Sequence, residues 1–132
     1  MRLVGVSRHP DQQEIQSYRP GGFTISGRRF RGSVAVFEDR VEAWEVADPA
    51  ALEVRHLLRF REVEPPVDLL LLGLGVGFAV PAPAVLRALA EWRLPFELMS
   101  TAAACRTFNL LLSEGRRVAA ALIALPEGGA DR

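Results

Sequence analysis

The residues with the most chemical potential lie close together in the C-terminal half of the chain. Ser100 and Thr101 are followed within one short segment by Cys105, Arg106 and Asn109. A thiol in the first turns of a helix and beside an arginine ionises more readily than a free cysteine. An arginine also presents a fork of N–H groups that fits a carboxylate or a phosphate. The segment therefore offers two candidate chemistries, a reactive thiol and the recognition of an anion.

Cys105 has a second interpretation as a core residue. It shares one helical stripe with Phe108 and Leu112, and a free cysteine is among the most often buried residue types. Cysteine–histidine catalysis needs a positioned base, whereas His9 and His56 lie in distant segments. We favour the core interpretation and keep the reactive thiol as the alternative.

Arg106 and Asn109 lie three residues apart, so they form a polar stripe on an otherwise apolar helix. One interpretation is structural: Arg106 pairs with Glu97, a charged residue in a preceding strand that we expect to be largely buried. The other is that Arg106 binds a ligand or a partner. Both interpretations stay open at the level of sequence.

Three glycines follow an apolar run at Gly73, Gly75 and Gly77. The dinucleotide fingerprint G-x-G-x-x-G would need a glycine where Phe78 stands, and a P-loop would need a lysine, which the chain lacks. We favour a conformational role for these glycines over contact with a ligand.

The order of elements suggests how these residues come together. In α/β sheets, ligands bind beyond the carboxyl ends of parallel strands, where a capped helix directs N–H groups and a positive dipole end. If the two strands are neighbours, the glycine loop and the helix start line one crevice. The predicted site, with no catalytic and no metal-binding residue, is Gly73, Gly75, Gly77, Glu97, Ser100, Thr101, Cys105, Arg106 and Asn109.

The first half of the chain predicts an antiparallel β-meander, and the second half alternates strand and helix. Such alternation implies parallel strands joined by right-handed crossovers. The predicted fold is α/β, in three layers with a mixed central sheet. The expected strands are 23–25, 30–37, 41–46, 68–73, 96–99 and 118–125, and the expected helices run from 48 to before 65, from 83 to 92 and from 100 to 115.

Length and composition bound the class of protein. The 132 residues suit one domain over 1–132, with 1–17 and 126–132 expected to be loosely ordered. Sixteen basic and sixteen acidic residues give a net charge of zero, which argues against a nucleic-acid binder. One cysteine and no apolar leader fit the cytoplasm. The apolar run 69–86 contains glycines and prolines, so we expect no membrane span.

Other patterns add little chemistry. We find no C-x-x-C, H-E-x-x-H or G-x-S-x-G spacing, and we expect no cofactor. Arg28, Arg29 and Arg31 suit a solvated strand edge better than an acidic partner. Trp44 is expected in the core.

Taken together, several motifs resemble a family of small α/β proteins of unknown function that includes the mitochondrial complex I assembly factor 3 and an adipogenesis-associated relative. The resemblance spans residues 18–125, and its marks are Tyr18-x-x-Gly21-Gly22-Phe23, Gly32-Ser33, Trp44, Leu71-Leu-Gly-Leu-Gly75, Glu97-Leu-Met-Ser-Thr101, Ala104-Cys-Arg-Thr-Phe-Asn109 and Glu114-Gly-Arg-Arg-Val-Ala-Ala-Ala-Leu122. It implies a mixed sheet flanked by helices, no established catalysis and, for some members, partner binding during complex I assembly.

The chain departs from the family pattern at three positions. Leu74 stands where the family usually has threonine, Phe108 replaces a common tyrosine, and Ser100 replaces a common aspartate while keeping the ability to cap a helix. Two polar groups are thereby lost from the predicted crevice.

We therefore predict a non-enzymatic binding or assembly protein of the bacterial cytoplasm, monomer or homodimer, whose crevice recognises another protein or a small anion. The first alternative is a small-anion-binding or thiol-dependent enzyme or redox protein that uses Cys105 and Arg106. The second is that the crevice is structural and that Arg28, Arg29 and Arg31 on the meander carry the function.

Overall fold

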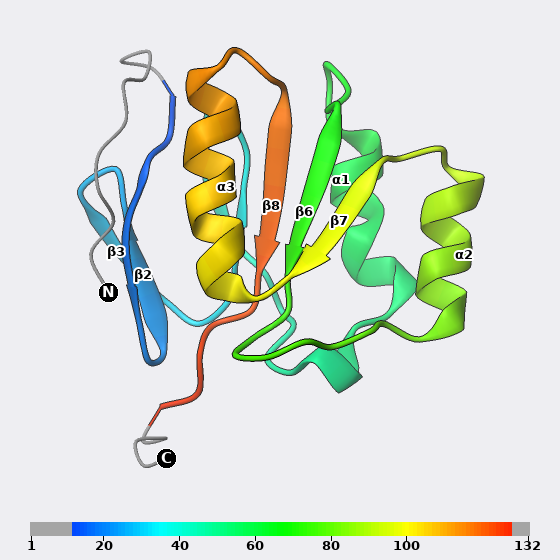
Figure 1. Cartoon of the computed structure of the whole chain (residues 1–132), viewed down its shortest axis with the longest axis horizontal. Helices are drawn as coiled ribbons and strands as arrows, with labels where there is room; N and C mark the ends of the chain where they lie inside the picture. The colour runs from blue at the N-terminus through cyan, green and yellow to red at the C-terminus, as the bar shows by residue number, and fades with distance from the viewer. Residues whose placement is uncertain (1–11, 128–132) are drawn as a thin grey trace.

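A computed structural model describes residues 12–127 of the chain (Figure 1). Its N-terminal part is a three-stranded antiparallel sheet of order β1-β2-β3. The strands are β1 (Ile15–Arg19), β2 (Gly22–Ile25) and β3 (Arg28–Arg31). Tight turns join these strands, and both turns contain glycine with positive φ, at Gly21 and Gly27.

The remaining strands form a mixed five-stranded sheet of order β5-β4-β8-β6-β7. Its strands are β4 (Val34–Val36), β5 (Val41–Ala43), β6 (Leu69–Gly73), β7 (Phe96–Met99) and β8 (Val118–Leu122). β6 pairs in parallel with β7 on one side and with β8 on the other, while β4 joins β8 and β5 antiparallel. The mixed sheet and its parallel half are as predicted.

Helices cover both faces of this sheet. They are the 3₁₀ turns η1 (Pro49–Ala51) and η2 (Val54–Leu57), and the α-helices α1 (Leu58–Glu62), α2 (Pro83–Glu91) and α3 (Thr101–Ser113). Figure 1 shows α1 and α2 on one side of the sheet, and α3 with the three-stranded sheet on the other. The predicted three-layer arrangement is confirmed.

Two apolar clusters hold the layers together, one on each face. Because side chains alternate along a strand, Leu70 and Leu72 pack toward α1 and α2, whereas Leu71 packs toward α3. β8 is buried at every position, which is typical of a central strand covered on both faces. Trp44 lies in the first cluster, as expected.

The predicted strand over residues 30–37 is wrong in one respect, because the chain changes sheets in its middle. Gly32 takes a positive φ of 85° and its N–H donates to the carbonyl of Gly21. Ser33 follows, and its Oγ accepts a hydrogen bond from the Ala124 N–H. The meander therefore comprises β1–β3, and the β4–β5 hairpin belongs to the central sheet.

The predicted helix after residue 48 is also corrected. Asp48 caps as expected, since its carboxylate accepts from the Ala50 N–H, but the segment forms two 3₁₀ turns before the short α1. The first turn ends because Leu52 returns to an extended conformation. The apolar spacing in this segment was too irregular to support one continuous helix.

Residues 1–17 are not uniformly loose, because β1 begins at Ile15, whose side chain is fully buried. Of the two segments expected to be loosely ordered, residues 1–11 and residues 128–132 lie outside the described part of the chain.

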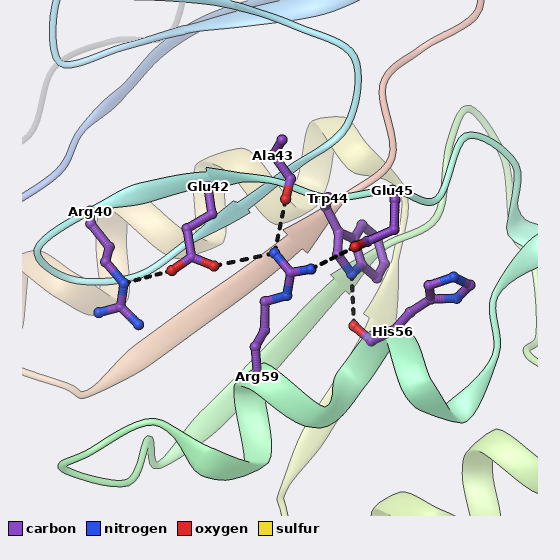
Figure 2. Close-up of polar contacts among 7 residues, drawn as sticks. All are labelled: Arg40, Glu42, Ala43, Trp44, Glu45, His56 and Arg59. Atoms are coloured by element: carbon purple, nitrogen blue, oxygen red, sulfur yellow. Dashed lines mark hydrogen bonds and ion pairs between the residues drawn. The ribbon is translucent and has the colours of Figure 1, made fainter.

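An arginine network fixes α1 over the edge strand β5. Arg59 donates to Glu42 at 3.2 Å, to the Ala43 carbonyl at 2.8 Å and to Glu45 at 2.7 Å (Figure 2). Arg40 donates to the other oxygen of Glu42 at 2.8 Å. These contacts cover the outer backbone of β5 with charged side chains, which is a common protection of an exposed sheet edge.

Asn109 joins α3 to the three-stranded sheet. Its Oδ1 accepts from the Ile15 N–H and its Nδ2 donates to the Ile15 carbonyl, both at 2.9 Å. The amide thus takes the place of a neighbouring strand beside β1. Both groups are buried, so removing the amide would leave two backbone groups without partners.

We predict that Asn109→Ala lowers the free energy of unfolding by about 2–4 kcal/mol, because two buried backbone groups lose their hydrogen bonds. Urea denaturation measures this directly. Ser113→Ala, at a partly exposed position of the same helix, is the control and should change stability by less than about 0.5 kcal/mol. Equal effects of the two substitutions would contradict the role given to Asn109.

Candidate functional site

The two strand ends of the predicted crevice are neighbours. β6 and β7 pair in parallel with Gly73 opposite Met99, so the loops after both strands begin at the same edge of the sheet. The chain continues into α2 on one face and α3 on the other. Such a point of divergence is where α/β proteins usually bind ligands.

Thr101 closes this point by hydrogen bonds. Its Oγ1 accepts from the Gly75 N–H at 2.9 Å and donates to the Ile123 carbonyl at 2.7 Å. Its own N–H donates to the Gly75 carbonyl at 2.9 Å. The side chain is fully buried, so Thr101 ties together the ends of β6 and β8 and the start of α3.

Gly73 leaves no room beneath the helix. A Cβ there would lie 3.0 Å from Ala104 Cβ, from Leu122 Cδ2 and from Thr101 Cα. Gly75 takes a φ of 98°, which an L side chain rarely adopts. These two glycines serve close packing and the turn, in agreement with the conformational role that we favoured. Gly77, by contrast, is exposed with open space around it.

The start of α3 is capped from within the chain, as predicted. Ser100 is the N-cap, and its Oγ accepts from the Ala103 N–H at 3.2 Å. Serine at this position therefore makes the capping contact.

Cys105 is a core residue. Its side chain is fully buried beside Phe108 and Leu112, and burial raises the pKa of the thiol to about 12 although the nearby Arg106 charge lowers it. A thiol with that pKa is protonated at neutral pH and is a poor nucleophile. The structure therefore does not support the reactive-thiol alternative.

Arg106 and Asn109 do not form one continuous polar surface on α3. Asn109 is buried and bonded to Ile15, whereas Arg106 is exposed. Glu97 is exposed as well, because β7 is an edge strand whose α3-side face the helix does not cover. Within residues 12–127, neither Arg106 nor Glu97 forms an ion pair, so the expected buried pair is wrong. Arg106 stays a candidate for recognition of a partner.

The loop between β6 and α2 holds a surface that the sequence did not reveal. Val76 is 73% exposed, Phe78 81% and Val80 60%, while Ala79 and Pro81 face the core. We call Val76, Phe78 and Val80 the apolar loop. The available signal is the lack of any charged residue from 69 to 86, but such a run fits a buried strand and its turn equally well.

Large apolar side chains seldom gather on the surface of a protein that works alone. Three such side chains lie within five consecutive residues, at the edge of the sheet where α/β proteins usually bind ligands, and they form a candidate contact surface. Within the described residues, no group of three or more histidine, cysteine or acidic side chains is placed to hold a metal ion. In the same part of the chain, the helices are too short or too polar to cross a membrane.

The chain resembles known proteins over most of its length. A family model described as a protein of unknown function (DUF498/DUF598) matches residues 15–123. The chain is 38% identical over 114 residues to NADH dehydrogenase (ubiquinone) 1 alpha subcomplex assembly factor 3 of Danio rerio, covering 86% of this chain and 66% of that protein. It is 38% identical over 112 residues to an uncharacterized protein of Rhodobacter capsulatus, covering 85% of each.

A solved structure has the same fold. The solution structure of a Mth938-like domain from Bordetella pertussis superimposes with a TM-score of 0.77 at 26% identity, covering 100% of this chain and 98% of that one. The chain spans just under two thirds of the length of several assembly-factor relatives. The resemblance expected from the sequence motifs is confirmed at the level of family and fold.

We predict that Thr101→Val lowers the free energy of unfolding by about 2–4 kcal/mol, because valine keeps the shape but removes both hydrogen bonds. Thr101→Ser is the matched control, since it keeps the hydroxyl and loses only a methyl group, at about 1 kcal/mol. Thermal or urea unfolding compares the two. A valine variant as stable as the serine variant would refute the proposed closure.

We predict that the Cys105 thiol does not react with a disulfide reagent in the native protein at pH 8, because it is buried and its pKa is raised. Unfolding in guanidinium should release one reactive thiol per chain, which serves as the internal control. Rapid reaction of the folded protein would show that the thiol is accessible after all.

Proposed function

The chain belongs to the DUF498/DUF598 family of proteins of unknown function, and we propose that it is a non-enzymatic assembly protein that binds another protein. Its assembly-factor relatives support this role. Three residues of the predicted crevice, Thr101, Cys105 and Asn109, are engaged in the packing of α3, whereas Arg106 is exposed and can contact a partner.

The apolar loop is the observation that carries the proposal. Phe78 is the most exposed large apolar residue that the structure describes, and Val76 and Val80 extend its surface on either side. An exposed aromatic side chain gains most when a partner removes it from water. The exposed Phe78 side chain lowers the solubility of the free protein, and its burial against a partner removes that disadvantage.

Contacts at both ends of the apolar loop hold it in an outward position. Thr101 holds Gly75 at one end, and the buried Pro81 with α2 holds the other. The loop is therefore short and fixed at both ends, so that little conformational entropy is lost when a partner binds.

We further propose that the partner is a subunit or assembly intermediate of a respiratory NADH dehydrogenase, by analogy with the named relatives. This finer step rests on proteins that are longer than this chain. We also propose the cytoplasm as the site of action, since the single cysteine suits a reducing compartment.

A tagged pull-down from the native host tests both steps. We expect subunits of NADH dehydrogenase to be enriched on the wild type and reduced about tenfold or more on Phe78→Ser, because hot-spot aromatic residues carry that share of binding energy. Leu110→Ser is the matched control: Leu110 is 49% exposed on α3, outside the apolar loop, and its replacement should leave capture unchanged.

Two results would count against the proposal. Equal capture by Phe78→Ser and Leu110→Ser would remove the apolar loop as the contact surface. Capture that depends on Phe78 but contains no respiratory subunit would keep the binding role and reject the link to NADH dehydrogenase.

A further inference from the structure

A second surface lies on the outward face of the three-stranded sheet. Tyr18, Phe23 and Phe30 occupy one cross-strand row and pack toward α3. Because neighbouring residues alternate between faces, Arg19 and Arg31 lie on the other side, in the row of Gly22. Arg29 shares that outward face, opposite Thr24.

These three arginines line a hollow of about 300 Å³, which Pro20, Gly21 and Glu127 complete. Gly22 contributes no side chain between Arg19 and Arg31, and a Cβ there would collide with the Phe30 carbonyl. The Arg19 guanidinium lies over Gly22, because its Nη2 is 3.5 Å from the position that such a Cβ would take. It also donates to Thr24 Oγ1 and to the Phe23 carbonyl, whereas Arg29 and Arg31 complete the basic lining.

The charges of this hollow are not balanced within the described chain. Arg19 is oriented by a hydrogen bond to Thr24 Oγ1 at 3.1 Å. Across residues 12–127, no carboxylate forms an ion pair with Arg19, Arg29 or Arg31. Three close positive charges repel one another, and an added carboxylate relieves that repulsion while accepting hydrogen bonds.

One carboxylate already lies at the rim. Glu127 packs against Gly21, where any Cβ would collide with its carboxylate. The tail is held there because the Gly21 N–H donates to the Leu125 carbonyl at 2.8 Å. The hollow thus accommodates a carboxylate, and Glu127 is placed to compete with one from outside.

An apolar hollow of about 470 Å³ adjoins the basic one. The two have Gly21, Arg31 and Glu127 in common, so they lie next to each other. Leu125 and Pro126 give the apolar part its accessible apolar surface, whereas Trp44 lies beneath it and is only 3% exposed. Glu45 also lines this part, and its carboxylate is paired with Arg59. We call the two parts together the arginine groove. It lies at the end of the molecule from which the apolar loop also emerges, since β6 and β8 run parallel (Figure 1).

We propose that the arginine groove binds an extended acidic segment of a partner protein, with carboxylates on Arg29 and Arg31 and a neighbouring apolar side chain beside Leu125. Charge complementarity and the alternation of basic and apolar lining select this occupant. The inference rests on the proposed protein-binding function and deepens it by naming the chemistry of the partner.

Fluorescence anisotropy with a short labelled peptide of alternating glutamate and leucine tests the groove directly. We expect Arg29→Ala and Arg31→Ala each to weaken binding about tenfold, as is usual for a charge-assisted hydrogen bond. Arg28→Ala is the matched control: it removes the same charge from the same strand, but Arg28 lies on the other face, over the Phe30 ring, outside the groove.

Glu127 gives a result in the opposite direction. Because its carboxylate competes at the rim, Glu127→Gln should bind the probe more tightly than the wild type does. A purely non-specific attraction to surface arginines would give Arg28→Ala the same loss as the other two variants. That outcome, or no binding of the probe to the wild type, overturns the inference.

Two further arms separate the possible failures. Displacement of the peptide by succinate at equal concentration would reassign the groove to a small dicarboxylate and overturn the peptide proposal. Phe78→Ser should bind the probe normally, because Phe78 does not line the groove. If capture does not depend on Phe78 but the probe binds, the apolar loop alone is rejected. If capture depends on Phe78 but the probe does not bind, the arginine groove alone is rejected.

Discussion

The hydroxyl of Thr101 makes the two buried hydrogen bonds on which one whole end of the molecule depends. By accepting from Gly75 and donating to Ile123, it fixes the ends of β6 and β8 to the first residue of α3. The contact requires the helix to sit directly on the sheet, and Gly73 permits that approach because it has no side chain. Where many α/β proteins keep an open crevice, this chain has a closed junction.

Because this junction is closed, the surface available to a partner lies outside it. The chain beyond Gly75 cannot fold back into the crevice, so Val76, Phe78 and Val80 extend into solvent. The chain beyond Ile123 leaves at the same end and runs along the turn between β1 and β2, where Leu125 and Glu127 complete the arginine groove. An apolar and a basic surface therefore emerge from one end of the molecule, which suits the docking of a partner better than chemistry on a small substrate.

Local patterns in the sequence were sufficient for the elements near this end. The apolar run of β6, the proline at the start of α2 and the serine cap of α3 each indicate an element by its own chemistry. Contacts distant in sequence were beyond such reasoning. Asn109 bonds Ile15 across 94 positions, and no local pattern says that an asparagine in a helix replaces a strand partner. The exposure of Phe78 is likewise not indicated locally, because the same apolar run also forms the buried strand β6.

Amide hydrogen exchange of the native protein tests the closed junction most directly. If Thr101 closes it, the Gly75 and Thr101 amides are protected by their hydrogen bonds, while those of Val76 and Phe78, for which the described structure shows no acceptor, exchange rapidly. The boundary between slow and fast exchange should then fall between residues 75 and 76. Exchange of the Gly75 amide as fast as that of Phe78 would mean that the crevice opens in solution, and it would contradict the account given for this end of the molecule.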